Sequence, residues 1–157
     1  RWLKDYALLS RKYFPDVNES LSGAGAAGGL GFAFLTFLHA SLESGIKIVL
    51  DETKLRDYVQ NADIVVTGEG RLDGQTVMGK APIGVAKIAK EYDKPVIAFS
   101  GCVTKDAIAC NEHGIDAFFP VLRSVSTLDE AMRRTNAMQN IEDTAEQVFR
   151  LIRTFSH

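Results

Sequence analysis

The segment "DIVVTGEGRLDGQTVMGKAPIGVAKIAKEYDKPVIAFS" (residues 63–100) decides the fold. It starts with a short run of apolar, β-branched residues and continues through a glycine-rich polar loop. A helical spacing of apolar residues then covers 82–92, and a second apolar run follows at 95–100. Such apolar runs are typical of strands buried on both faces of a sheet. A strand, a helix and a strand in this order predict parallel strands joined by a right-handed crossover.

The same alternation continues toward the C-terminus. We expect a helix from Thr104 that Gly114 closes, and a third strand at 116–121. A capping-box spacing, Thr127 followed by Glu130, begins the next helix, and an amphipathic helix ends the chain. The sequence therefore predicts an α/β fold with a parallel sheet flanked by helices.

The N-terminal part of the chain lacks this rhythm. Helical patterns cover 2–14 and 29–44, with a turn-rich stretch between them, and Gly45 is expected to end the second helix. A β-branched run at 46–50 predicts a short strand, and a helix is expected at 51–62. We therefore place a domain boundary near residues 58–63.

Composition excludes several classes of protein. The 157 residues are 46% hydrophobic and 24% charged, the balance of a soluble globular protein. A net charge of -2 provides no basic surface for nucleic acid or an anionic membrane. The two cysteines, Cys102 and Cys110, can build neither a disulfide framework nor a zinc site, so we expect reduced thiols and a cytoplasmic location. No apolar run is long enough to span a bilayer.

The first motif is "GAGAAG" at 23–28, which has the letters of a G-x-G-x-x-G dinucleotide fingerprint. That fingerprint must follow a strand, and the residues before Gly23 form a polar loop. Dinucleotide binding is therefore the weakest interpretation. Two others stay open: free N–H groups at a helix start that bind an anion, or small residues that let helices pack closely.

The second motif is "GQTVMGK" at 74–80, which satisfies G-x-x-x-x-G-K. A phosphate-binding P-loop continues with Ser or Thr for Mg²⁺, whereas this chain has Ala81 and Pro82. The P-loop also starts directly after its strand, and here 68–73 intervene. The underlying physics still applies, because glycine N–H groups, a helix N-terminus and Lys80 all attract anions.

Two acids in the same loop change its expected chemistry. Glu69 and Asp73 would repel phosphate, but two carboxylates beside Lys80 indicate metal-assisted phosphoryl transfer or general-base catalysis. The loop follows a parallel strand at its carboxyl end, where α/β sheets bind ligands. Ser100 and Thr104 follow the next strand and either line the same cleft or cap the next helix. The alternative interpretation of the loop with Glu69, Asp73 and Lys80 is a polar surface loop with local ion pairs.

Two stretches together resemble the bacterial glycerate kinase family. They are "GAGAAGGLGFAF" (23–34) and "ADIVVTGEGRLDGQTVMGKAPIGVAKIAK" (62–90), and TGEG-x-LD-x-QT-x-x-GK is the most specific part. Members are similar in having a flavodoxin-like, Rossmann-like α/β domain with a second α/β domain inserted into it. On this resemblance, 1–60 is the C-terminal part of the inserted glycine-rich helical domain, and 61–157 is the C-terminal part of the flavodoxin-like domain.

The resemblance also implies a function. Family members transfer phosphate from ATP to D-glycerate and form 2-phosphoglycerate, with Mg²⁺ as the expected metal. The expected partners are glycerate, ATP, the missing N-terminal part of the same enzyme and, as one option, a second copy in a homodimer. The chain then represents a C-terminal fragment that needs its N-terminal half for activity. A nucleotide-binding oxidoreductase module and a non-catalytic fragment of a kinase-like protein are the alternatives.

The resemblance implies that one loop lines the active cleft, through Gly68, Glu69, Gly70, Asp73, Gln75, Thr76, Gly79 and Lys80. By their chemistry, Asp73 and Glu69 are each candidates for the catalytic base and for a magnesium ligand. Lys80 would neutralise developing phosphate charge.

A second group of candidate residues lies in the glycine-rich stretch. The backbone N–H groups of Gly25, Ala26, Gly28 and Gly29 are expected to bind the carboxylate or phosphate of the substrate.

Overall fold

The computed structural model describes residues 2–155. Residues 1 and 156–157, the outer ends of the predicted segments 1–60 and 61–157, lie outside the described residues. The chain forms two compact units, which divide between Gly45 and Ile46. This division falls before the expected boundary near residues 58–63, because the intervening residues, Leu50 and Val59 among them, are part of the core of the second unit. The domain assignments within a longer enzyme stay predictions.

The first unit consists of two helices, α1 (Trp2–Arg11) and α2 (Ala26–Leu38). Its small core contains Ala7, Ala24 and Phe32, and the ring of Tyr6 meets Phe32 edge-on with 5.5 Å between the centroids. The prediction that the second helix runs to Gly45 is wrong. His39 adopts a left-handed conformation (φ 50°) and its N–H donates to the carbonyl of Phe34, which ends the helix.

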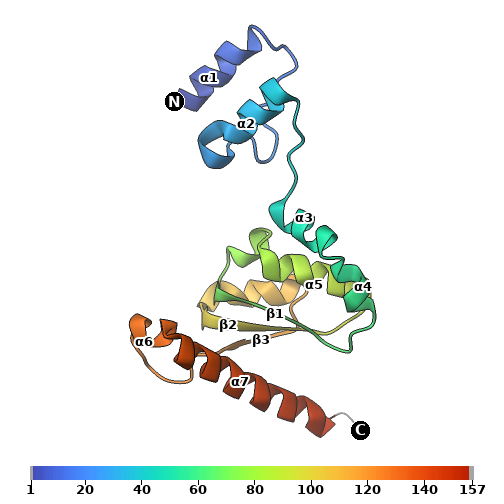
Figure 1. Ribbon diagram of the computed structural model, residues 1–157, viewed down its shortest axis with the longest axis vertical. Coiled ribbons are helices and arrows are strands. Elements are labelled where there is room, and N and C mark those ends of the chain that lie inside the picture. Colours follow the sequence, from blue (N-terminus) through green and yellow to red (C-terminus); the bar gives the residue numbers. More distant parts are fainter. Residues whose placement is uncertain (1, 156–157) are drawn as a thin grey trace. The chain divides into compact units, whose positions relative to one another are not determined.

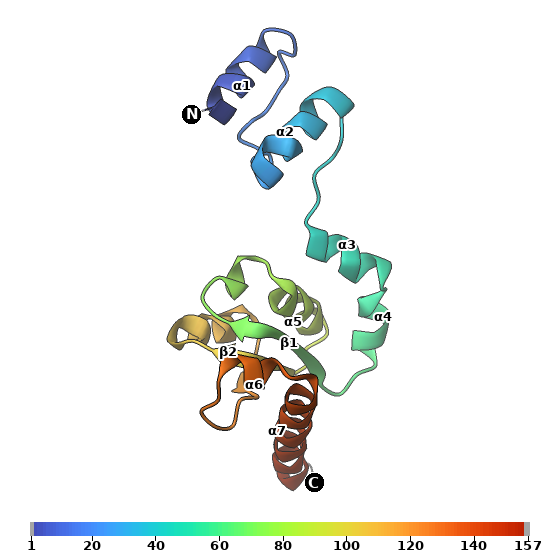
Figure 2. The same cartoon turned by 60° about the vertical axis from the view of Figure 1, so that its left-hand side comes forward.

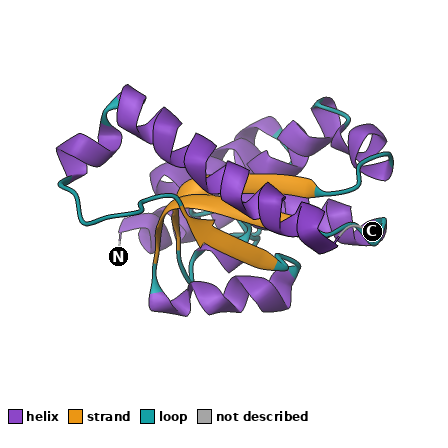
Figure 3. Ribbon diagram, turned by 90° about the horizontal axis from the view of Figure 1, so that it is seen from below, coloured by secondary structure: helices purple, strands orange, loops and turns teal. Residues whose placement is uncertain are grey.

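The second unit contains a parallel sheet of three strands in the order β1 (Val65–Leu72), β2 (Val96–Val103) and β3 (Ala117–Pro120). Val65 lies opposite Val96, and Ile97 lies opposite Ala117. Figure 1 and Figure 3 show helix α5 (Ala81–Glu91) on one face of the sheet and α7 (Arg134–Phe155) on the other. The predicted α/β fold with a parallel, helix-flanked sheet is confirmed.

The main core lies between α5 and the sheet. Its most completely buried members include Ile83 and Ala86 from α5 and Val96 and Ala98 from β2, all with no exposed surface. The apolar residues that recur at helical spacing in α5 therefore face the central strand, β2. Most of the core is built by the part of the sequence in which strands and helices alternate.

The strand predicted at 46–50 is wrong, because this segment is part of helix α3 (Gly45–Glu52). Ile46 and Leu50 are four residues apart and so lie on one helix face, next to Gly84 of α5. A Cβ added at Gly84 would lie 2.7 Å from Ile46 Cγ1, so the glycine permits this close approach. Figure 2 shows α3 followed by helix α4 (Leu55–Gln60), which leads into β1.

Other elements are confirmed with changed bounds. The helix expected from Thr104 is a 3₁₀ helix, η2 (Lys105–His113), and Gly114 ends it with φ 99°. The capping box of Thr127 and Glu130 is present at the start of α6 (Leu128–Met132). None of the helices within residues 2–155 combines the length and the apolar character needed to cross a membrane.

Helix α7 keeps much of its apolar surface uncovered. Val148 is 7% exposed, whereas Ile141 is 49% and Leu151 is 56% exposed, although the helical spacing of these three apolar residues places them on one face. The described sheet has three strands, and it covers only part of this 22-residue helix.

Truncation of the core should destabilise the second unit strongly. Ile83→Ala removes a fully buried side chain between α5 and the sheet, so we expect a loss of about 3 kcal/mol in the free energy of unfolding. Urea denaturation followed by circular dichroism measures it. Ile108→Ala, at a residue that is 66% exposed, is the matched control and should change little. Equal midpoints for the two variants would contradict this core.

Candidate active site

The candidate site begins on a strand. β1 continues through Gly68, Glu69 and Gly70 to Leu72, further than its apolar run predicts, because Glu69 pairs with Ser100 and Leu72 with Val103 in the parallel ladder. A turn and a short 3₁₀ helix, η1 (Thr76–Met78), follow. Gly79 then takes φ 101° and α5 begins. Both acids and the lysine of the motif therefore lie at the carboxyl end of a parallel strand.

Thr76 lies at the centre of this arrangement. Its side chain has no exposed surface, and its hydroxyl donates to Glu69 Oε1 at 2.5 Å. The hydroxyl oxygen of Thr76 accepts the backbone N–H of Asp73 at 3.2 Å and lies 3.5 Å from Asp73 Oδ1. One buried hydroxyl thus contacts both carboxylates. The structure places Thr76 behind the acids rather than at the surface that a ligand would meet.

Lys80 joins the two acids from the other side. Its ammonium is 3.3 Å from Asp73 Oδ1 and 3.8 Å from Glu69 Oε2. The acids are about 20% exposed and Lys80 is 39% exposed, so the lysine is the most accessible charge of the three. Arg71 adds a second cation, with Nε 3.7 Å from Asp73 Oδ2. The structure therefore brings together the three predicted catalytic residues.

The surroundings of Asp73 favour its charged form. Partial burial raises the pKa of this carboxyl, but the Lys80 ammonium, the Gln75 N–H at 3.0 Å and the Arg71 guanidinium outweigh it and hold the pKa below its usual value. Asp73 is therefore an anion at neutral pH, and it is suited to bind cations.

The neighbouring strand supports the loop. Asp106, at the start of η2, accepts the N–H of Gly74 at 3.1 Å and the hydroxyl of Thr104. The Thr104 hydroxyl and the Gly74 N–H lower the pKa of Asp106. A Cβ at Gly74 would lie 2.6 Å from Asp106 Oδ2, so only glycine allows this bond without rearrangement. Asp106 was not among the residues predicted from the sequence, although an acid two residues after Thr104 is a helix-start signal.

Ser100 and Thr104 link the ends of β1 and β2. The Ser100 hydroxyl accepts the N–H of Leu72 at 2.9 Å and donates to the carbonyl of Cys102 at 2.7 Å. The backbone N–H of Thr104 donates to the carbonyl of Leu72 at 3.0 Å, and the hydroxyl oxygen of Thr104 lies 3.2 Å from the same carbonyl. These bonds hold β1 in the sheet as far as Leu72, and so fix the position from which the loop departs.

The oxygen donors fit a magnesium ion of the kind that binds nucleotides. Mg²⁺ commonly uses one or two carboxylates and completes its shell with substrate phosphates and water. Glu69 and Asp73 are such a pair, and Thr76 holds them together. Within residues 2–155 no group of three or more histidine, cysteine or acidic side chains is arranged to hold a metal. The pair therefore fits a shared, phosphate-completed ion rather than a closed protein cage.

The glycine-rich stretch belongs to the first unit. Ala27, Gly28 and Gly29 have φ values of 50°, 69° and 96°, so the regular part of α2 starts only after them. A Cβ at Gly29 would lie 2.5 Å from Leu3 Cδ2, which supports the close-packing interpretation at that position, whereas Gly25 and Gly28 face open space. Residues 2–45 contain no strand, so the strand that must precede a dinucleotide fingerprint is absent before Gly23.

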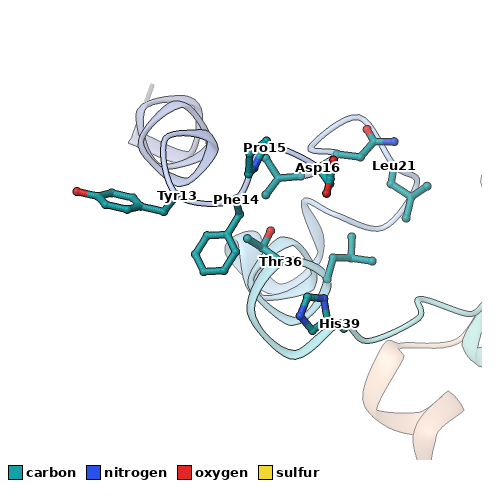
Figure 4. A pocket seen from close by; sticks show the side chains of 10 residues that line it. Tyr13, Phe14, Pro15, Asp16, Leu21, Thr36 and His39 are labelled. Carbon is teal, nitrogen blue, oxygen red and sulfur yellow. The ribbon is translucent and has the colours of Figure 1, made fainter.

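A small cavity also lies in the first unit (Figure 4). It has a volume of about 260 Å³ and is lined by Tyr13, Phe14, Asp16, Thr36 and His39 among others. The Thr36 hydroxyl is buried and has no hydrogen-bond partner within the described residues. None of the glycines of the motif lines this cavity, so it gives no support for the predicted anion site.

Comparison with known proteins gives consistent matches. The model of the glycerate kinase family matches residues 1–153. Glycerate kinase of Haemophilus influenzae is 47% identical over 131 residues, which are 83% of this chain and 34% of that protein. Glycerate 2-kinase of Escherichia coli is 48% identical over 131 residues, with the same two shares of 83% and 34%.

A solved structure gives the same match. A protein of Salmonella typhimurium LT2 assigned as glycerate kinase 2 superposes with a TM-score of 0.72 at 42% identity, over 96% of this chain and 38% of that one. The chain thus spans about a third of the length of the curated relatives it matches.

Removal of the lysine should change the titration of the acid beside it. Lys80→Met deletes the cation 3.3 Å from Asp73 Oδ1, so the pKa of Asp73 should rise toward its usual value. A ¹³C-detected carboxyl titration by NMR in magnesium-free buffer measures it. Lys87→Met, at an exposed position of α5, is the control and should leave that pKa unchanged. The same pKa in both variants would contradict the proposed ion pair.

Proposed function

The chain belongs to the glycerate kinase family, and we propose that it supplies the phosphoryl-transfer loop of an ATP-dependent kinase that acts on D-glycerate. The observation that carries the proposal is the convergence of Glu69, Asp73 and Lys80 around Thr76 at the carboxyl end of β1. Because the chain spans about a third of its relatives, we propose that it acts together with the N-terminal remainder of the enzyme. A cytoplasmic location and a homodimeric assembly are parts of the same proposal.

At phosphorus, the proposed reaction forms one bond and breaks one. A hydroxyl oxygen of glycerate attacks the γ-phosphorus of ATP, the bond from that phosphorus to the β,γ-bridging oxygen breaks, and ADP leaves. The hydroxyl proton passes to a carboxylate of the protein. We infer that the 2-hydroxyl reacts and 2-phosphoglycerate forms, since the relative from Escherichia coli bears the name glycerate 2-kinase.

The geometry supports different roles for the two acids. Asp73 Oδ1 already accepts from Gln75 and Lys80, and Oδ2 faces Arg71, so we assign Asp73 to the binding of cations. Within residues 2–155, the 3.8 Å contact with Lys80 is the one contact of Glu69 Oε2, and we propose this oxygen as the acceptor of the proton. Thr76 is a positioning residue for both.

Lys80 and magnesium complete the proposed site. The Lys80 ammonium is the most exposed of the three charges and would donate to the transferred phosphoryl group, where negative charge develops. Asp73 would hold Mg²⁺, which when bound neutralises phosphate charge and fixes its orientation. The backbone N–H groups of Gly68 and Gly70 and the side-chain amide of Gln75 are proposed contacts for substrate or phosphate, whereas the N–H of Gly79 already donates to the carbonyl of Thr76. In the first unit, the N–H groups of Ala26 and Gly29 donate to the carbonyls of Gly23 and Gly25, which leaves Gly25 and Gly28 as the proposed contacts there.

The test is a coupled assay of ADP release. The chain is mixed with the N-terminal remainder of the Escherichia coli relative, and ATP, Mg²⁺ and D-glycerate are added. We expect glycerate-dependent ADP release and ³¹P NMR signals of 2-phosphoglycerate. A folded mixture that consumes no ATP would instead favour a non-catalytic fragment, and an absorbance change with NAD(P)H would favour the oxidoreductase.

Neutralisation of the cation-binding acid should abolish most turnover. Asp73→Asn keeps the shape of the side chain but removes the charge that orients Lys80, so kcat should fall by at least about 100-fold. Asp93→Asn, at an exposed turn after α5, is the matched control and should keep full activity. Near-normal turnover of Asp73→Asn, with the fold verified by circular dichroism, would remove Asp73 from the mechanism.

A further inference from the structure

The peptide group that precedes the Cα of Asp73 is held at both of its polar ends. Its carbonyl, which belongs to Leu72, accepts the backbone N–H of Thr104 at 3.0 Å. Its N–H, which belongs to Asp73, donates to Thr76 Oγ1 at 3.2 Å. Because a peptide group is planar, bonds at its two opposite edges fix its orientation as well as its position. One of the two peptide planes that meet at Asp73 is therefore fixed.

The peptide group that follows is held in the same way. Its carbonyl, which belongs to Asp73, accepts the N–H of Thr76 at 3.0 Å. Its N–H, which belongs to Gly74, donates to Asp106 Oδ2 at 3.1 Å. Since φ and ψ are the only soft torsion angles of the backbone, two fixed planes set both angles of Asp73 and the direction of its Cα–Cβ bond. That direction brings Asp73 Oδ1 to 3.3 Å from the Lys80 ammonium.

Asp106 supplies its bond from a different element and from a side chain. It lies at the start of η2, 32 residues from Gly74 in the sequence. Its other oxygen, Oδ1, accepts the hydroxyl of Thr104, whose backbone N–H binds the carbonyl of Leu72. The segment 104–106 therefore reaches the peptide groups on both sides of Asp73, and it attaches the loop after β1 to the segment that follows β2.

The residue at position 74 shows how closely the Asp106 carboxylate approaches the loop. Gly74 does not have a left-handed φ, so its backbone conformation is open to other residues. A Cβ there would nevertheless lie 2.6 Å from Asp106 Oδ2 and 3.2 Å from Asp106 Cγ. An added methyl group would therefore displace the carboxylate and break its bond to the N–H of residue 74.

We propose that Asp106 is a positioning residue for phosphoryl transfer, which aims the Asp73 carboxylate by fixing the peptide group between Asp73 and Gly74. The role requires a hydrogen-bond acceptor at this place and not a negative charge. Asparagine retains the acceptor, because its Oδ1 can accept the Gly74 N–H while its amide donates to Thr104 Oγ1. The effect on turnover rests on the proposed function, whereas the effect on the loop can be measured in the chain alone.

Amide hydrogen exchange of the chain, followed by NMR without ligands, tests the positioning. In Asp106→Ala, exchange should become several-fold faster at Asp73 and Gln75, because the turn that holds these two amides loses its attachment to η2. Asp106→Asn should keep the slow rates. Glu112→Ala, at an exposed position near the end of η2, is the matched control and should also keep them.

The pattern of exchange decides between the possible roles of Asp106. Unchanged rates at Asp73 and Gln75 in Asp106→Ala, or faster exchange confined to η2, would overturn the proposal. Rates in Asp106→Asn as fast as in Asp106→Ala would also overturn it, since charge would then be the required property. If Asp106→Ala loosens the whole unit, seen as faster exchange at Ala86 in the core, Gly74→Ala displaces the same carboxylate and replaces it in the test.

Kinetics in the mixture with the N-terminal remainder give the second readout. Asp106→Ala should lower kcat by about 10- to 100-fold, the usual cost of losing a group that orients a ligating side chain, with the KM for glycerate unchanged. Asp106→Asn should restore most of the turnover. Gly74→Ala added to Asp106→Ala should lower kcat no further, because both changes break one bond. A normal kcat with a raised KM for glycerate would contradict the role.

The two readouts separate this proposal from the kinase function. A mixture without kinase activity, in which Asp106→Ala still speeds exchange at Asp73 and Gln75, would contradict the kinase and leave the positioning of the loop established. An active mixture in which Asp106→Ala changes neither kcat nor exchange would overturn the positioning role while the kinase function stands.

Discussion

The hydroxyl of Thr76 is the contact on which the candidate site depends. It donates to Glu69 Oε1 and accepts the N–H of Asp73, and so it joins a strand residue to a loop residue. Two carboxylates held close together repel each other, and a hydroxyl that donates to one of them offsets part of this cost. Lys80 balances part of the remaining charge from the solvent side. The hydroxyl and the ammonium together offset the repulsion between two carboxylates at the end of one strand.

This arrangement differs from the P-loop whose letters it partly shares. In a P-loop the hydroxyl that helps to bind Mg²⁺ follows the lysine directly, whereas here Ala81 and Pro82 follow Lys80. The hydroxyl of this loop precedes the lysine instead, at Thr76, and it contacts carboxylates. The carboxylate of Asp73 then provides the oxygen ligand that we propose for the metal, and that of Glu69 the proposed proton acceptor. The loop thus combines an anion-attracting lysine with acids that a pure phosphate cradle lacks.

The sequence predicts the elements whose patterns are local. The apolar runs of the strands, the face of α5 and the capping box of Thr127 all depend on near neighbours, and the structure confirms them. The features that could not be predicted from the sequence depend on contacts between residues far apart in the chain. The run at 46–50 has strand composition but becomes helical because Ile46 and Leu50 pack at Gly84. Glu69 lies on a strand because of its register with β2, and pairing of that kind has no signature in a single glycine-rich segment.

The same distinction applies to the candidate site. The loop and its charged residues could be predicted because spacing alone indicates their chemistry, but burial of Thr76 and support by Asp106 come from the tertiary fold.

The central claim is that the loop from Gly68 to Lys80 receives the nucleotide phosphates. Hydrogen–deuterium exchange of the chain with its N-terminal remainder, with and without Mg²⁺, ATP and glycerate, tests it most directly. The account predicts slower amide exchange at 68–80 in the presence of the ligands. Protection confined to other segments, with unchanged exchange at 68–80, would contradict it.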